Sequence, residues 1–289
     1  MQYGIYYAYW AKHWRGDFIP YAEKVKRLGF DILEVACGAF DQAPLSYFRE
    51  LRQASQAAGL RLTGGYGPRP EHNLASPDPA VVQNAFDFYR DIFPKLQAAG
   101  IDSLGGALYS FWPASGVTAP DRAGDLARST DNMRRLADLA AEHGISLYME
   151  VLNRFEGYLL NEAKEAAAYA DAVGRDNVKV MLDTFHMNIE EDSLPDAIRL
   201  TGRRLGELHI GEANRRPPRP GRMPWEAIGA ALREIGFDGK VVMEPFVKTG
   251  GEVGRDIRLW RDLSDGADTA ALDREAARSV AFIRGLFAG

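Results

Sequence analysis

The chain has 289 residues, enough for one barrel-sized core or for two smaller domains. Hydrophobic residues make up 46% and charged residues 26%, as in an ordinary globular protein. The net charge of −5 argues against nucleic acid as the main partner, because phosphate binding needs a basic face.

The single cysteine, Cys37, excludes an intrachain disulfide and favours a reducing compartment. The first residues, MQYGIYYAYWAKHW, lack the basic segment and the uninterrupted apolar stretch of a signal peptide. No apolar run approaches the ~20 residues that a membrane helix needs. We therefore expect a cytoplasmic protein with no membrane partner.

Short apolar runs of strand length recur along the chain. Several are nearly continuous rather than alternating, which is typical of a parallel strand that is covered on both faces. The predicted strands cover residues 4–10, 32–36, 60–66, 103–109, 146–152, 178–184, 205–211 and 240–246.

Amphipathic segments lie between these runs and predict helices. In residues 21–30 apolar positions recur at helical spacing, and Gly29 suits a helix C-cap. Residues 223–237 have Pro224 near the expected start and Gly236 just past the expected end. Similar helices fit residues 44–58, 79–99, 122–143, 161–173 and 268–287.

This alternation of eight strands with helices predicts an α/β fold, a (β/α)8 TIM barrel. A doubly wound sheet is the alternative, but it usually has a glycine-rich turn after its first strand, and YYAYWAKHW contains no glycine. No linker stands out, so we expect a single barrel domain over residues 1–289. The loop ANRRPPRPGRMP follows a strand directly and is expected to be functional.

The ends of the last four predicted strands present Glu150, Asp183, His209 and Glu244, at gaps of 33, 26 and 35 residues. In a barrel these ends line one mouth, where three carboxylates would raise one another's pKa. A divalent cation resolves this conflict. Three oxygen donors and one nitrogen donor suit Mn²⁺, Mg²⁺ or Co²⁺.

Each of these residues alone has a simpler interpretation, such as a salt-bridge partner or, for His209, a hydrogen-bonded core histidine. Their equivalent positions in four successive repeats favour the metal site. Three further residues stay open at this point. Arg215 is either a substrate contact or an ordinary loop residue. Glu156, like His186, is a metal ligand if the chain turns back after its strand, and otherwise a substrate contact or a cap. His186 is a ligand if the chain turns after Asp183, and otherwise a substrate contact or a cap.

Aromatic residues crowd the early strand ends. Most are expected in the core or at the barrel rim, and a few are expected to form an apolar wall against the C–H face of a sugar. These residues are Tyr6, Tyr7, Tyr9, Trp10, Trp14 and Trp112.

Several longer motifs point to a family. EVLNRFE, LDTFHMNIEE, H-x-GEANRR, GRMPW and VMEPFVKTGG strongly resemble the ketose 3-epimerases, the D-tagatose and D-psicose (allulose) 3-epimerase group of the xylose-isomerase-like barrels. The resemblance runs the whole length of the chain, from GIYYAYW to WRDLSDGAD. The chain departs from the family pattern at Tyr66 and Tyr109, which leaves the preferred ketose open.

The resemblance implies a barrel with one divalent metal per subunit, Mn²⁺ first and Co²⁺ or Mg²⁺ as alternatives. It implies metal ligands at Glu150, Asp183, His209 and Glu244, of which the two glutamates also form the acid/base pair. It further implies a homo-oligomer, either a dimer or a tetramer. The implied substrate contacts are Tyr6, Ala107, Trp112, Glu156, His186 and Arg215.

The implied reaction is epimerisation of a free ketose at C3, such as D-fructose to D-psicose, D-tagatose to D-sorbose, or ribulose to xylulose. One glutamate removes the C3 proton and the other returns a proton to the opposite face, through a metal-stabilised enediolate. The alternatives are an aldose–ketose isomerase on the same barrel and a non-enzymatic sugar-binding protein with a structural metal. A related barrel family that cuts DNA uses several zinc ions and a basic surface, and the net charge and five histidines argue against it.

Overall fold

The structure is a computed structural model that describes residues 1–114 and 116–288. Over these residues, parallel strands pair in chain order and close into a barrel, since β1 also pairs with β8. This confirms the predicted (β/α)8 fold. The strands are β1 Gln2–Tyr6, β2 Ile32–Ala36, β3 Arg61–Gly65, β4 Ser103–Gly106, β5 Ser146–Glu150, β6 Val178–Asp183, β7 Leu205–Ile210 and β8 Lys240–Met243.

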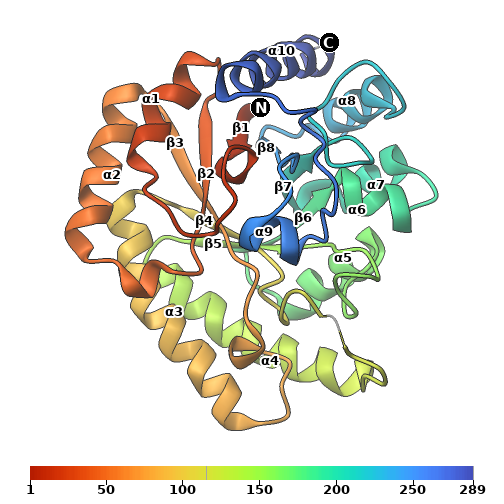
Figure 1. Cartoon of the computed structure of the whole chain (residues 1–289). Helices are drawn as coiled ribbons and strands as arrows, with labels where there is room; N and C mark the ends of the chain where they lie inside the picture. The colour runs from red at the N-terminus through yellow and green to blue at the C-terminus, as the bar shows by residue number, and fades with distance from the viewer. Residues whose placement is uncertain (115, 289) are drawn as a thin grey trace.

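Helices surround the strands in chain order, as Figure 1 shows. The longer helices pack their apolar faces against the outside of the barrel and bury a continuous core, whereas α9 lies at one end of the barrel. The helices are α1 Ile19–Arg27, α2 Leu45–Ala58, α3 Pro79–Ala99, α4 Arg122–Glu142, α5 Ala163–Val173, α6 Thr184–Glu190, α7 Leu194–Thr201, α8 Trp225–Glu234, α9 Gly251–Asp256 and α10 Thr269–Phe287.

All eight expected strands are present, but most end earlier than the apolar runs do. The first run, 4–10, becomes β1 and then a 3-10 turn over Tyr7–Tyr9, and the last run, 240–246, leaves the sheet after Met243. The runs are longer because most of the residues beyond the strands are also buried. Apolar composition therefore marks burial here, and not only strand pairing.

Three helices were not predicted: α6, α7 and α9. They are short, so they contain too few turns for a clear 3.6-residue period. Local caps begin two of them. The Asp183 side chain accepts a hydrogen bond from Phe185 N at 2.6 Å, and Ser193 Oγ accepts one from Asp196 N at 3.4 Å.

The closure of the barrel brings the ends of β5, β6, β7 and β8 to one mouth. These strands are successive neighbours, and the register pairs Asp183 with His209. At the end of β4, Gly106 has a φ of +127°, and a Cβ there would lie 2.1 Å from Tyr66 O. Only glycine allows β3 and β4 to approach this closely at the mouth.

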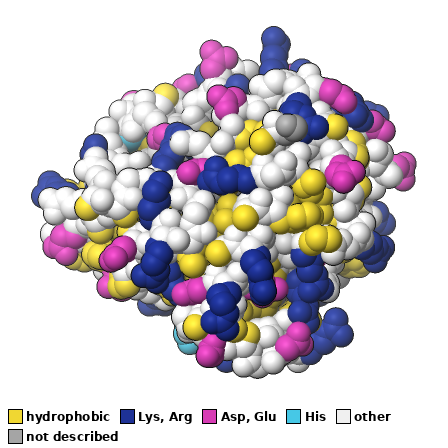
Figure 2. Space-filling model, turned by 90° about the horizontal axis from the view of Figure 1, so that it is seen from above, with side chains coloured by type: hydrophobic (Ala, Val, Ile, Leu, Met, Phe, Trp, Pro, Cys, Tyr) yellow, Lys and Arg dark blue, Asp and Glu magenta, His cyan; other side chains and the backbone are white. Residues whose placement is uncertain are grey.

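None of the described helices is long and apolar enough to cross a membrane. On the face shown in Figure 2, basic and acidic side chains are interspersed.

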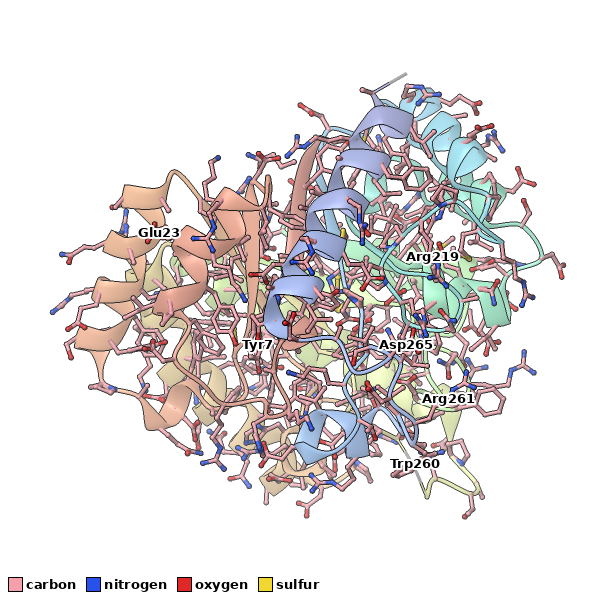
Figure 3. All side chains as sticks on the ribbon, turned by 45° about the horizontal axis from the view of Figure 1, so that its top comes forward. Tyr7, Glu23, Arg219, Trp260, Arg261 and Asp265 are labelled. Atoms are coloured by element: carbon pink, nitrogen blue, oxygen red, sulfur yellow. The ribbon has the colours of Figure 1, made fainter. Side chains whose placement is uncertain are left out.

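Figure 3 places Trp260 and Arg261 on the loop between α9 and α10, where Trp260 is 74% exposed. Phe155, on the loop after β5, is the other aromatic residue among the exposed large hydrophobic side chains of the described chain.

Candidate active site

Glu150, Asp183, His209 and Glu244 come together at the mouth of the barrel. Glu150 and Asp183 are the last residues of β5 and β6, His209 lies near the end of β7, and Glu244 directly follows β8. One donor atom from each lies within 4.8 Å of the others, so the group has the dimensions of a metal site. The arrangement is the one that the strand-end spacing predicts.

Asp183 is buried, Glu150 and Glu244 are half-buried, and the three carboxylates repel one another. Burial and the charge of Glu244 raise the pKa of Glu150 well above its usual value. Burial also raises the pKa of Asp183, although the charges of His186 and Arg215 oppose the shift. A cation among these groups is therefore favoured electrostatically.

Arg215 supplies a positive charge on one side of the group. Its Nη1 lies 3.2 Å from Asp183 Oδ2 and 3.0 Å from Glu244 Oε2. The guanidinium packs 3.8 Å from the centroid of the Phe185 ring. The Arg215 backbone has a φ of +66°, an uncommon conformation for a non-glycine residue, which turns the side chain back into the mouth.

On its other side, His209 contacts a second acidic group that sequence reasoning missed. His209 Nε2 lies 2.9 Å from Glu34 Oε1 and 3.7 Å from Glu207 Oε1. The shorter contact is a close ion pair rather than a well-aligned hydrogen bond. A signal was present for Glu207, which lies two residues before His209 on the same strand and therefore faces the same side.

The residues of this second group have pKa shifts of opposite sign. Burial would raise the pKa of Glu34, but the nearby His209 outweighs it, so that the pKa of Glu34 is lowered. Burial and the charge of Glu34 raise the pKa of Glu207 to about 7. Burial would lower the pKa of His209, but Glu34 and Glu244 outweigh it and raise this pKa well above its usual value.

Glu156 and His186 lie beside the group of four. Glu156 accepts hydrogen bonds from Trp112 Nε1 at 2.9 Å and from Asn153 Nδ2 at 3.2 Å. Asn153 Nδ2 also lies 2.7 Å from His186 Nδ1, and His186 Nε2 lies 3.7 Å from Glu150 Oε1. His186 is buried in α6 and borders the pocket, outside the four-residue group.

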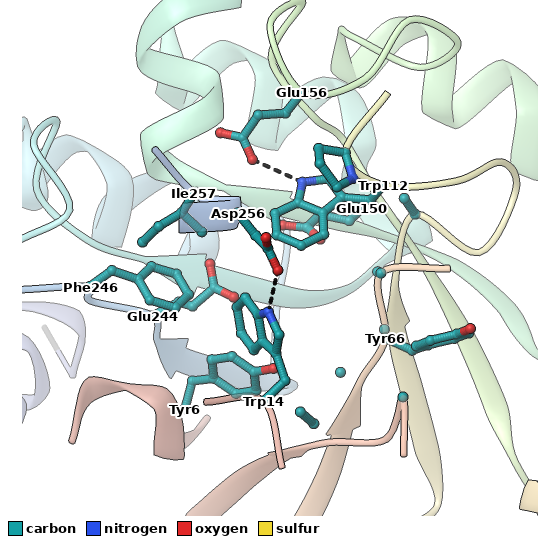
Figure 4. A pocket seen from close by; sticks show the side chains of 18 of the residues that line it. Tyr6, Trp14, Tyr66, Trp112, Glu150, Glu156, Glu244, Phe246, Asp256 and Ile257 are labelled. Carbon is teal, nitrogen blue, oxygen red and sulfur yellow. Dashed lines mark hydrogen bonds between the residues drawn. The ribbon is translucent and has the colours of Figure 1, made fainter. Parts of the chain in front are cut away.

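A pocket of about 280 Å³ opens above these side chains. Tyr6, Ala107 and Trp112, which the family resemblance marks as substrate contacts, all line it. Trp14 and Phe246 extend the aromatic wall, with ring centroids 6.2 Å apart (Figure 4). Of the other aromatic residues at early strand ends, Tyr7, Tyr9 and Trp10 belong to the core.

One edge of the pocket is formed by α9, which sequence reasoning missed. Trp14 Nε1 donates a hydrogen bond to Asp256 Oδ2 at 2.8 Å (Figure 4). Val253 N donates to Lys12 O at 3.1 Å, so α9 is attached to the loop after β1. The pocket is therefore closed on this side by two segments that are far apart in the sequence.

The two residues that depart from the family pattern do not point into the pocket. Tyr66 borders it, but its ring points away from the centre in Figure 4, and its hydroxyl lies 2.6 Å from His72 Nδ1. Tyr109 lies behind the site, where its hydroxyl donates to the backbone oxygen of Glu150 at 3.0 Å. Both side chains therefore support the wall of the pocket.

Comparison with known proteins assigns the family. Residues 22–266 match the family model of the xylose isomerase-like TIM barrel. D-psicose 3-epimerase of Agrobacterium fabrum is 49% identical, with 100% of both chains covered. D-psicose 3-epimerase of Ruminiclostridium cellulolyticum is 49% identical, over 98% of this chain and 97% of the relative.

Solved structures agree with this assignment. A crystal structure of D-psicose 3-epimerase in the presence of D-fructose has a TM-score of 0.98 and 49% identity, and covers 100% of both chains. The Clostridium cellulolyticum enzyme with D-tagatose has a TM-score of 0.97 and 49% identity, and covers 99% of both. The chain therefore belongs to the ketose 3-epimerase family of enzymes, within the xylose isomerase-like TIM barrels.

Proposed function

We propose that this enzyme interconverts free ketoses that differ in configuration at C3, among them D-fructose and D-psicose. The observation that carries the proposal is the pair Glu150 and Glu244. Both line the same pocket, from β5 and from the end of β8, which are separated around the barrel by β6 and β7. Inversion at C3 needs one acid/base group on each face of the sugar, and two glutamates that reach the pocket from non-adjacent strands support this assignment.

The donor set fits one divalent cation, with Glu150, Asp183, His209 and Glu244 as ligands. His209 Nδ1 is buried, makes no hydrogen bond within the described chain, and lies 3.7 Å from Glu244 Oε1. Three carboxylates and one imidazole suit Mn²⁺, Co²⁺ or Mg²⁺, and the family resemblance puts Mn²⁺ first. A cation bound there would polarise the C2 carbonyl and stabilise negative charge on the substrate oxygens.

The protein side chains then perform the proton transfers. One glutamate takes the proton from C3, and the electron pair of the C–H bond moves into a C2–C3 double bond as an enediolate forms. The other glutamate delivers a proton to the opposite face of C3, and the carbonyl at C2 is restored.

Neighbouring residues bind and orient the ketose. Arg215 and His186 lie beside the two glutamates and would interact with the sugar oxygens. Glu156, held by Trp112 and Asn153, supplies an acceptor for a sugar hydroxyl. The aromatic wall of Tyr6, Trp14 and Trp112 would pack against C–H groups and exclude water.

Glu150→Gln and Glu244→Gln test the assignment. Each variant should still bind ketose but lose epimerisation, by roughly 10²–10⁴-fold in kcat, because the amide cannot exchange a proton. Turnover is measured by chromatography, and ketose binding by calorimetry. Retained turnover in either variant would exclude the two-glutamate mechanism.

The reaction itself is tested with metal-stripped protein that is reloaded with Mn²⁺ and incubated in deuterated water. D-fructose, D-tagatose, D-psicose and L-ribulose are the substrates, and NMR locates the deuterium. Deuterium at C3 of an epimeric ketose, only with metal present, is the expected result. Aldose products would instead indicate an aldose–ketose isomerase, and metal binding without turnover would indicate a sugar-binding protein.

We also expect the enzyme to act in the cytoplasm as a homo-oligomer, a dimer or a tetramer. Size-exclusion chromatography with light scattering measures the oligomeric state directly. A mass of 32.0 kDa, that of one chain, would contradict the expectation.

A further inference from the structure

A polar group lies inside the barrel beneath the mouth, where a barrel interior is usually apolar. It consists of Glu34 on β2, Thr63 on β3, and Glu207 and His209 on β7. Each of these residues is at most 2% exposed. Buried carboxylates are costly unless they are paired, so these side chains need a reason to be there.

Glu34 is held on both of its oxygens. Thr63 Oγ1 donates a hydrogen bond to Glu34 Oε2 at 2.8 Å. Glu34 Oε1 lies 2.9 Å from His209 Nε2, as a close pair, and makes no hydrogen bond in the described chain. Around the barrel β1 and β8 separate β2 from β7, so this contact crosses the interior instead of following neighbouring strands.

The contact determines which ring nitrogen of His209 faces the mouth. With Nε2 near Glu34, the other nitrogen, Nδ1, lies 3.7 Å from Glu244 Oε1, within the group that also contains Glu150 and Asp183. An imidazole that binds a metal through one nitrogen commonly donates its other N–H to a carboxylate, which fixes the orientation of the ring. Glu34 is in the place where such a carboxylate is needed.

We propose that Glu34 is a positioning residue, which pairs with the Nε2–H group of His209 and so holds Nδ1 toward the cation site. The inference rests on the proposed function, because it gives His209 Nδ1 the role of a metal ligand. Thr63 keeps the Glu34 carboxylate in place. Glu34 acts through His209, and its role is to increase cation affinity and to fix the geometry of the site.

Glu207 provides a matched control, because it is a second buried carboxylate on the same imidazole nitrogen. Its Oε1 lies 3.7 Å from His209 Nε2, compared with 2.9 Å for Glu34. Glu207→Gln and Glu34→Gln therefore make the same chemical change in the same environment. They differ in whether the carboxylate that loses its charge is the one in close contact with His209.

The experiment titrates metal-stripped protein with Mn²⁺ and measures free Mn²⁺ by electron paramagnetic resonance. Glu34→Gln should bind Mn²⁺ roughly 10–100-fold more weakly, and Glu207→Gln should remain close to the unmodified protein. Excess Mn²⁺ should restore most of kcat in Glu34→Gln. In the diamagnetic Mg²⁺-loaded protein, the Nε2–H proton of His209 should be strongly deshielded, and Glu34→Gln should remove that shift.

Several results would overturn the inference. One is unchanged Mn²⁺ affinity in Glu34→Gln, and another is an equal loss in Glu207→Gln. A changed ketose KM with unchanged Mn²⁺ affinity would make Glu34 a substrate contact, and two Mn²⁺ ions per chain would make it a ligand. If Glu34→Gln does not fold, as judged by circular dichroism, Thr63→Val takes its place and should weaken Mn²⁺ binding by a smaller factor.

Failure of the proposed function has a different signature. In that case the unmodified protein binds Mn²⁺ but does not epimerise ketoses, while the affinity difference between Glu34→Gln and Glu207→Gln persists. The two proposals can therefore fail separately.

Discussion

Arg215 illustrates how much one residue contributes at this mouth. Its guanidinium is buried and contacts Asp183 and Glu244 directly. Burial would lower the pKa of Arg215, but the carboxylates of Glu156 and Asp183 outweigh it and raise this pKa. The side chain therefore remains charged at any pH at which the enzyme folds, and its planar fork reaches two carboxylates at once.

Arg215→Lys should reduce kcat/KM by roughly 10–100-fold, because lysine keeps the charge but cannot reproduce the two-sided contact. Arg216→Lys is the matched control, since Arg216 pairs with the exposed Asp265 away from the four-residue group. Steady-state kinetics on D-fructose and D-psicose measure both variants. Equal kinetics in the two variants would contradict a specific role for Arg215.

At the scale of elements, α9 and the loop after β1 form one edge of the pocket. The connection depends on Gly251, which has a φ of +68°. A Cβ at this position would lie 2.1 Å from Lys12 O. The same backbone approach allows Val253 N to bond to Lys12 O, so the glycine is what permits α9 to attach to the loop.

Gly251→Ala should therefore displace α9 and raise the ketose KM, because the Trp14–Asp256 contact is disturbed. Gly236→Ala is the control: its φ is +66°, but a Cβ there meets nothing within 4 Å. Both variants should lose about 1 kcal/mol of unfolding free energy to backbone strain. Gly251→Ala should lose more because of the clash with Lys12 O, and only this variant should change KM. Thermal unfolding and steady-state kinetics measure the two effects, and an unchanged KM in Gly251→Ala would contradict the role of α9.

At the scale of the whole molecule, the barrel has polar groups at both ends of its interior. Opposite the mouth, Lys240 is 4% exposed, and its Nζ lies 3.2 Å from Asp102 Oδ1. Burial would raise the pKa of Asp102, but the charges of Lys240 and Arg61 outweigh it and lower this pKa. This ion-pair group connects β3, β4 and β8 around the closed sheet.

The lowered pKa gives a pH dependence with a definite sign. The Asp102 contribution to stability is present above the unfolded-state pKa of about 3.9, and is lost as the pH falls through the lower folded-state value. Because Asp102 is partly exposed, Asp102→Asn should cost about 1 kcal/mol of unfolding free energy at pH 7. Urea unfolding at pH 7 and pH 3 measures the difference, and a loss that does not shrink at pH 3 would contradict this assignment.

Much of the fold and of the candidate site could be predicted because the sequence patterns that specify them are local and repeated. The apolar runs, the helical spacing between them and the acidic or histidine residue at each of four successive strand ends all lie within short windows of sequence. In a parallel barrel, equivalent positions in successive repeats converge on one mouth, so the grouping of Glu150, Asp183, His209 and Glu244 follows from spacing and fold class together.

By itself, the sequence determined the barrel class, the order of its strands and the strand-end residues that meet at the mouth. Only the tertiary structure decided that Glu34 pairs with His209, that α9 attaches to the loop after β1, and that Tyr66 turns away from the pocket. Each of these features joins segments distant in the chain or depends on a side-chain direction. Such contacts and side-chain directions depend on the closure of the barrel and on packing between distant segments. A local sequence pattern cannot predict them.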